Sequence, residues 1–390
     1  MGSPSGPVRR LQRFRRPVAI IAGLVAALLV VVLVPNRWCG RDADAWFQGD
    51  PVRMRALAEE LVVFEADDDQ QRATGGGALA DMWGLLTHQM TALGLAQICL
   101  SHPEWRDRYA PIATRAAAKT LLPEMRSAFT AAWHGEDGLT VPDSPHGHAY
   151  LSYPALALGM ARLVDPAFPA DLAAQQDTII ASYERRVLAS PTALLDTLPG
   201  EAYPTDMAAV AAAIAVHGRA TGTDHSAVLA HWAQQVRAVQ LDPATGLVVQ
   251  RMGTDAHPHD APRASGTGLA AYFAGFANRS LAAELTAAFS HQERTLLGFS
   301  AIHEYAPGTT GPADIDSGPV VLGISVSATS FGLATARSLG NRPLFTRLFR
   351  TADLLGLPQR TGSRLRFTTA GATGNALLLA FLTSGPELAS

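Results

Sequence analysis

Lysine is almost absent from this chain of 390 residues. Lys119 is the only lysine, so the remaining basic residues are arginines. We interpret this bias, together with the abundance of alanine, as the mark of a GC-rich genome rather than of a function, and alanine favours helix. Charge of any sign is also scarce, at 17% of residues and a net charge of −3. A nucleic-acid-binding face needs a clear excess of basic groups, so nucleic acid is excluded as a partner.

Several catalytic motifs are missing. The chain has no Gly-x-Ser-x-Gly elbow, no glycine-rich phosphate loop, no dinucleotide fingerprint and no His-Glu-x-x-His helix. His-x-His pairs occur twice, at His146 and His148 and at His257 and His259, but this spacing alone is a weak signal for metal. We therefore expect no cofactor and assign no metal ligand.

The N-terminus differs in composition from the rest. Residues 1–17 carry five arginines and no acidic residue, and an uninterrupted apolar run, Val18–Val34, ends at Pro35. A run of this length is at the short end of what spans a bilayer, and the arginines favour a cytoplasmic N-terminus. The pattern predicts a signal-anchor helix at 18–35, a cell-membrane localisation with a single pass, and an extracytoplasmic domain at 36–390.

Two cysteines, Cys39 and Cys99, lie within that predicted domain. Outside the cytoplasm two cysteines more often form a disulfide than remain reduced, so we expect a bond between them. Two buried free thiols are the alternative. Overall, 48% of the residues are hydrophobic, which excludes disorder for most of the chain.

Beyond the anchor the pattern is helical throughout, with no convincing alternation of the kind that marks strands. Asp50 and Pro51 have the positions of an N-cap and a first helical residue. Further helices are predicted at about 79–101, 104–132, 147–164, 169–189, 203–221, 224–239, 264–278, 279–295, 318–339, 342–355 and 372–384. Paired as hairpins, these segments predict an all-α (α/α)6 toroid, and an open helical solenoid is the alternative.

Polar residues interrupt the apolar helices or stand at their starts in four places. The candidate catalytic residues are His148, Asp206, Glu304, Asp314 and Asp316; the candidate substrate-binding residues are His88, His146, Tyr150, Tyr203, Arg263 and Tyr305. Singly, each has a structural explanation, such as a helix cap for Asp206 or Asp316. Together, histidine and carboxylates at helix starts after turns predict an acid–base site in one cleft.

The segments from Trp83 to about Pro358 resemble the linalool dehydratase/isomerase family. The best match runs from His303 to Pro358, with a Glu before a Pro-Gly-Thr loop and an Asp-x-Asp-x-Gly turn. Other matches are Gly147-His148 at a helix start, Gly200 to Asp206, and Ser265-Gly266. The resemblance implies an (α/α)6 barrel, a homo-oligomer, a disulfide in the N-terminal part and a catalytic role for His148.

The chain departs from the family at several active-site positions. The two family cysteines correspond to positions near Ala202 and Ala211, the methionine before the histidine to Ser144, and a tyrosine to Thr267. We therefore expect this chain to share the fold of the family but not its reaction on linalool.

Three functions remain open from the sequence. The first is a carbon–oxygen lyase or isomerase that acts on an apolar alcohol in a water-poor cleft. The second is a glycoside hydrolase or polysaccharide lyase that uses paired carboxylates such as Asp206 and Asp316 across an open aromatic groove. The third is a non-catalytic binding module. The expected ligand is thus a small molecule or a glycan.

Overall fold

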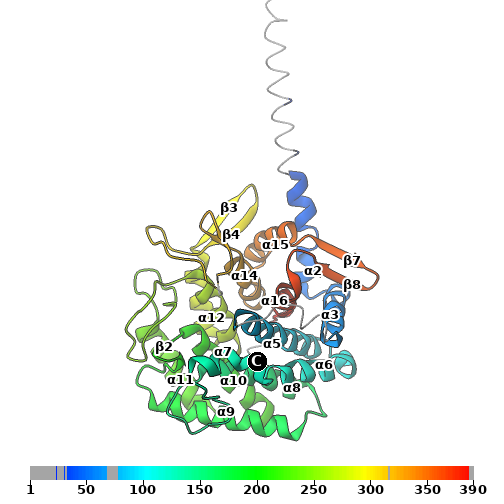
Figure 1. Cartoon of the computed structure of the whole chain (residues 1–390). Helices are drawn as coiled ribbons and strands as arrows, with labels where there is room; N and C mark the ends of the chain where they lie inside the picture. Colours follow the sequence, from blue (N-terminus) through cyan, green and yellow to red (C-terminus); the bar gives the residue numbers. More distant parts are fainter. Residues whose placement is uncertain (1–22, 24–29, 31–32, 68–77, 315–316, 386–390) are drawn as a thin grey trace, which may run out of the picture.

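Helices make up most of the chain (Figure 1). The computed structural model describes residues 23, 30, 33–67, 78–314 and 317–385. Its α-helices are α2 (Ala43–Gln48), α3 (Pro51–Ala66), α5 (Ala78–Ser101), α6 (Arg106–Lys119), α7 (Pro123–Ala132), α8 (Ser152–Val164), α9 (Ala170–Ala189), α10 (Pro204–Thr221), α11 (Ser226–Gln235), α12 (Ala264–Ala277), α13 (Arg279–Ser290), α14 (Val326–Ser338), α15 (Arg342–Gly356) and α16 (Gly371–Thr383). Short 3-10 turns at Pro103–Trp105 and Ala149–Leu151 precede α6 and α8, and a π-helical turn at Val236–Gln240 follows α11. The predicted mostly helical class is confirmed.

A set of central helices packs side by side in sequence order. Helix α5 contacts α8, α8 contacts α10, α10 contacts α12, α12 contacts α14, α14 contacts α16, and α16 contacts α5 again. A second set lies outside them: α6 packs on α5 and α8, α9 on α8 and α10, α13 on α12, α15 on α14, and α3 on α16. In Figure 1, α3, α6, α9 and α11 accordingly lie at the periphery of the molecule.

Small side chains permit the close approach of the central helices. In α10 the consecutive residues Ala208–Ala213 are all buried, and so are Ser265–Ala271 of α12, the helix that packs on it. Gly94 of α5 has no room for a side chain, because a Cβ there would lie 2.6 Å from Leu379 of α16. Small residues thus permit close helix packing, and alanine also favours the helix itself.

The prediction for the start of α3 is confirmed. The helix begins at Pro51, and the carboxylate of Asp50 accepts a hydrogen bond of 2.9 Å from the backbone N–H of Arg53. This bond satisfies one of the backbone donors that every helix start leaves without a partner in the helix, and proline at the first position has no donor to lose.

Short strands, which the sequence pattern did not indicate, connect several helices. They are β1 (Asp196–Leu198), β2 (Glu201–Ala202), β3 (Glu293–Leu296), β4 (Phe299–His303), β5 (Val320–Val321), β6 (Ile324–Ser325), β7 (Pro358–Thr361) and β8 (Arg364–Phe367). They form an antiparallel β1–β2 pair, an antiparallel sheet of order β3-β4-β6-β5, and an antiparallel β7–β8 pair.

Tight turns explain why these strands were missed. The β3–β4 turn has Leu297 and Gly298 at φ 52° and 84°, and the β5–β6 turn has Leu322 and Gly323 at φ 52° and 79°. Two consecutive residues of positive φ form the hairpin turn that matches strand twist, but leucine at the first position is not a turn signal. The predicted helices at 279–295 and 318–339 therefore end or begin in strands instead.

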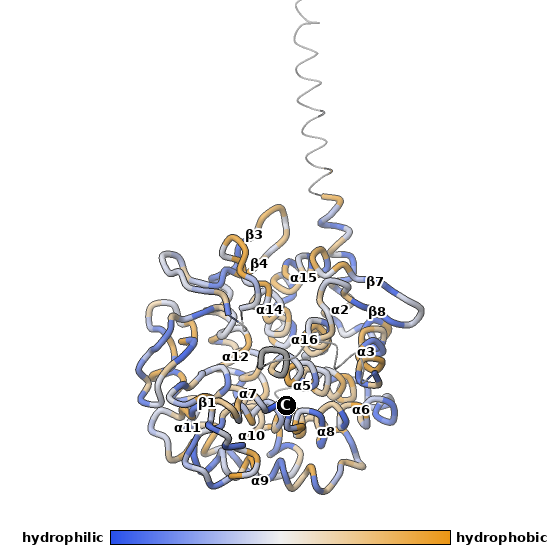
Figure 2. The backbone as a smooth tube through the Cα atoms, viewed as in Figure 1, coloured by the Kyte–Doolittle hydropathy of each residue, from blue (hydrophilic) through white to orange (hydrophobic). Residues whose placement is uncertain are grey.

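The hairpins differ in surface character (Figure 2). Leu296 and Leu297, at the tip of the β3–β4 hairpin, are exposed hydrophobic residues, whereas β7 is polar and exposed along its length.

The predicted membrane localisation is contradicted. In the described part of the chain, no helix is both long and apolar enough to cross a bilayer. Most of the predicted anchor at 18–35, and all of the basic segment 1–17, lie outside the described residues.

The predicted disulfide is also wrong. Cys39 and Cys99 are both buried and free. They lie in different surroundings, since the charged neighbours of Cys39 are Asp353 and Arg41 and those of Cys99 are Arg106 and Asp165. Burial raises the pKa of the Cys99 thiol to about 12, which keeps it protonated and unreactive.

Candidate active site

An apolar cavity of about 80 Å³ lies near the N-terminal ends of the central helices. The described residues that line it come from α5, α7, α8, α12, α14 and α16: Met82, Trp83, Leu85, Leu86, Phe129, Tyr153, Leu269, Ser327, Phe331 and Leu377. Besides the indole of Trp83, the polar side-chain groups among them are the hydroxyls of Tyr153 and Ser327. A ligand held here therefore meets a mostly apolar wall that includes Tyr153, Ser327 and Trp83.

Tyr153 connects this cavity to a buried carboxyl group. Its ring lines the cavity at the start of α8, and its hydroxyl donates a hydrogen bond to Oδ1 of Asp206, in the first turn of α10. The hydroxyl of Thr197, from β1, donates to the other oxygen of Asp206. The contact between α8 and α10 brings these groups together, although 53 residues separate Tyr153 from Asp206.

Burial raises the pKa of Asp206, and the hydrogen bonds from Thr197 and Tyr153 oppose that shift only in part. A carboxyl group with a raised pKa holds a proton at a higher pH than an exposed aspartate does. Such a group can give a proton to a ligand and take one back, which is the requirement for general acid–base catalysis.

A second cluster gathers other predicted residues around Arg263. Its guanidinium donates to Asp314 and to Asp260 (2.6 Å for the latter), and it lies 5.5 Å from the ring centre of Tyr305. Arg263 is buried, so these ion pairs compensate its charge. The structure places it between two carboxylates rather than at an open site for a ligand anion.

Glu304 directly follows β4 and lies close to this cluster, because its carbonyl accepts a hydrogen bond from Ala264 at the start of α12. It is fully buried, it accepts a hydrogen bond from the hydroxyl of Ser265, and burial raises its pKa. Asp316, the other predicted carboxylate, lies outside the described residues.

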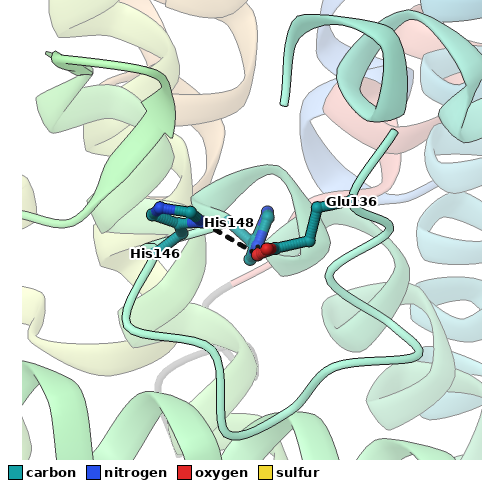
Figure 3. Close-up of side chains that lie close together, drawn as sticks. All are labelled: Glu136, His146 and His148. Atoms are coloured by element: carbon teal, nitrogen blue, oxygen red, sulfur yellow. Dashed lines mark hydrogen bonds and ion pairs between the residues drawn. The ribbon is translucent and has the colours of Figure 1, made fainter. Parts of the chain in front are cut away.

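His148 belongs to a third group, in the loop between α7 and α8. Its Nε2 lies 2.7 Å from Oε1 of Glu136, and Nδ1 of His146 lies 2.9 Å from the same oxygen (Figure 3). His148, Asp206 and Glu304 thus each bond to a different set of partners, and their place in one cleft stays a prediction.

The remaining predicted binding residues have structural partners. Nδ1 of His88 is 2.7 Å from buried Glu65, and the Tyr203 hydroxyl donates to Glu201 over 2.8 Å. Tyr150 is buried, stacks on Phe129 at 4.3 Å and accepts a hydrogen bond from the backbone of Gly138. The Tyr305 hydroxyl donates to the Pro312 carbonyl.

Two important residues escaped the sequence-based assignment. Glu136 had no motif around it, although it precedes a His-x-His pair in a polar loop. Tyr153 has no motif around it either, and its pairing with Asp206 depends on helix packing that no local signal reveals.

A comparison with known proteins identifies no relative, because neither a family model nor a curated protein sequence matches the chain. The resemblance to the linalool dehydratase/isomerase family therefore remains an interpretation of sequence segments.

Proposed function

We propose that this protein is an acid–base enzyme, a carbon–oxygen lyase or isomerase, that acts on a small apolar alcohol. The observation that carries the proposal is the Tyr153 side chain, which lines an apolar cavity and donates its hydroxyl hydrogen to buried Asp206. The scaffold that we propose is an (α/α)6 toroid. The return of the central helix contacts from α16 to α5, with a second set of helices outside, supports it.

The proposed reaction uses Asp206 and Tyr153 as one proton-transfer unit. The alcohol oxygen lies near the Tyr153 hydroxyl, which turns its hydrogen from Asp206 toward the alcohol, while protonated Asp206 becomes the donor to the tyrosine oxygen. Tyr153 then gives its proton to the alcohol oxygen and receives the proton of Asp206. The carbon–oxygen bond breaks, its electron pair leaves with the oxygen, and water forms. A proton from the neighbouring carbon then returns to the Tyr153–Asp206 pair, and the electrons of that C–H bond form the double bond. Addition of water by the reverse steps at another carbon gives isomerisation.

The apolar lining favours this reaction over cleavage of a glycan. A glycoside hydrolase needs two carboxyl groups facing the substrate, and the described lining contains none. Exclusion of water from an apolar cavity also strengthens the electrostatic effect of the one buried carboxyl group that reaches the wall through Tyr153.

The test is a comparison of turnover on two panels, tertiary and allylic apolar alcohols and oligosaccharides, analysed by mass spectrometry. We expect water loss or isomerisation of an alcohol by the wild-type chain. Asp206→Asn should reduce that rate by about 10²–10⁴-fold, which is the usual contribution of a general acid–base group. Tyr153→Phe should lower it as well, because the phenyl ring retains the shape and loses the proton.

Tyr272→Phe is the matched control, since it removes another buried tyrosine hydroxyl, the acceptor of a 2.7 Å hydrogen bond from Gln97, outside the described cavity lining. It should leave turnover unchanged. Sugar release without alcohol conversion would instead support the glycosidase. Binding of an alcohol without turnover would support the binding module.

A further inference from the structure

The loop between α7 and α8 brings three potential metal ligands to one place. Oε1 of Glu136, Nδ1 of His146 and Nε2 of His148 all lie within 4.8 Å of one another (Figure 3). Both histidine nitrogens are directed at the same carboxylate oxygen, at 2.9 and 2.7 Å. The hydroxyl of Ser144 donates to that oxygen too.

Two of the three groups, Glu136 and His148, are shifted toward the chemical forms that metals bind. Hydrogen bonds from Ser144, His146 and His148 lower the pKa of Glu136 to about 2, so its carboxylate is ionised. Burial lowers the pKa of His148, which favours the neutral imidazole. Neutral imidazole and carboxylate are the forms in which these side chains coordinate a cation.

The backbone around His148 is built to hold its ring in this position. His148 has a left-handed conformation, φ 46°, which is strained for a residue with a side chain. Gly138 faces the ring, and a Cβ there would lie 2.5 Å from its Cγ. The Tyr183 hydroxyl fixes the His148 carbonyl at 2.9 Å, and Trp133 packs at 4.8 Å from the imidazole.

One of the three side chains is buried and the other two are partly exposed, as in a metal site that leaves one coordination position open to solvent. The side chain of His148 is 1% exposed, whereas those of Glu136 and His146 are 28% and 44% exposed. A purely structural clamp gains little from His146, because water could bond to Glu136 there equally well. His146 also stacks on Trp133 at 4.6 Å, which orients its ring toward Glu136.

We propose that Glu136, His146 and His148 form a binding site for a divalent transition metal of the Zn²⁺ class, with a fourth position open to water. Two imidazoles and one carboxylate with a water are a known ligand set of catalytic zinc sites. Ligands on a tetrahedral Zn²⁺ at about 2.0–2.1 Å are about 3.3 Å apart. The two histidine nitrogens, which lie within 4.8 Å of each other, therefore have to approach to that distance, and Glu136 has to withdraw by about half an ångström from each nitrogen. The partly exposed side chain of Glu136 has room for that movement.

The chain contains its own control for this site. His257 and His259 repeat the His-x-His spacing with ring centres 6.0 Å apart, close to the 5.9 Å between His146 and His148. Among the described residues, however, no third ligand groups with them. The spacing is therefore the same in both histidine pairs, and the carboxylate of Glu136, beside His146 and His148, is what distinguishes the proposed metal site.

Isothermal titration of the metal-free full-length protein with Zn²⁺ tests the proposal, with Co²⁺ absorption as an independent measure of coordination. We expect one equivalent to bind, and visible Co²⁺ bands of four-coordinate intensity. His146→Ala and Glu136→Gln should each weaken Zn²⁺ binding by more than about 100-fold, since changes in outer partners alone cost 10–100-fold. His146 is partly exposed, so its replacement should leave the fold intact, as thermal unfolding of the metal-free variant will show.

The double variant His257→Ala/His259→Ala should bind Zn²⁺ as the wild type does. The proposal is overturned if the wild-type protein takes up no Zn²⁺, if His146→Ala binds it with unchanged affinity, or if binding is lost in the His257/His259 variant. These outcomes are independent of alcohol turnover, so the metal site and the proposed function fail or stand separately.

Discussion

Replacement of Asp206 by asparagine should change how stability depends on pH. In the folded protein, burial raises the pKa of Asp206 above its unfolded value of about 3.9. Below the unfolded pKa both states hold the proton, and the group contributes no pH dependence. Between the unfolded and the folded pKa only the folded state holds it, so stability falls as pH rises, by up to about 1.36 kcal/mol per pH unit. Asparagine has no such proton.

The wild-type protein should therefore lose stability relative to Asp206→Asn from about pH 4 upward, until the pH passes the folded pKa. Asparagine keeps the volume of the side chain, but its single oxygen serves one of the two hydroxyls, of Tyr153 and Thr197, that bond to Asp206. That loss costs about 1–3 kcal/mol and is constant with pH. Urea unfolding of both proteins from pH 4 to 8 measures the difference. Parallel curves over this range would refute a buried, proton-holding Asp206.

Three further predictions concern stability and the thiols. Arg263→Ala should destabilise the fold by about 1.5–3 kcal/mol, because it removes charged hydrogen bonds to Asp314 and Asp260, which are themselves partly exposed, and an unchanged thermal midpoint would contradict these ion pairs. Gly138→Ala should cost about 1–3 kcal/mol through overlap with the His148 ring, as measured by urea unfolding, whereas a neutral result would mean that the ring moves freely. Neither cysteine should react with a thiol reagent until the protein unfolds, and reductant should leave the thermal midpoint unchanged; a drop in the midpoint with reductant would mean a disulfide.

Helices could be predicted from the sequence where hydrophobic periodicity and end signals agree. The predicted segments at 79–101, 169–189 and 264–278 match α5, α9 and α12 closely. The predicted helix at 104–132 is divided by Pro123, which starts α7 after a break.

The strands could not be predicted because their signals are short or unusual. Strands β5 and β6 have two residues each, which is too few for alternation to show, and Leu322 takes a positive φ that sequence does not suggest. Tertiary contacts decide such segments, since β6 is held between β4 and β5.

Only part of the candidate site could be predicted from the sequence. Asp206 was identified from its place at a helix start after a turn, and the structure puts it at the cavity through Tyr153. The partners of these residues were not predictable, because His148, Asp206 and Glu304 each pair with a residue from a different segment. Glu136 lies 12 residues before His148, and only the folding of the loop brings them together.

The most direct measurement for the central claim is a crystal structure of the protein with a small apolar alcohol. We expect the alcohol to occupy the cavity between Trp83 and Phe331, with its oxygen about 2.7–2.8 Å from the Tyr153 hydroxyl. An alcohol bound elsewhere would contradict it, for example in the larger hollow of about 560 Å³ beside Met54 and Arg337. Absence of alcohol from the Tyr153 cavity at saturating concentration would contradict it equally.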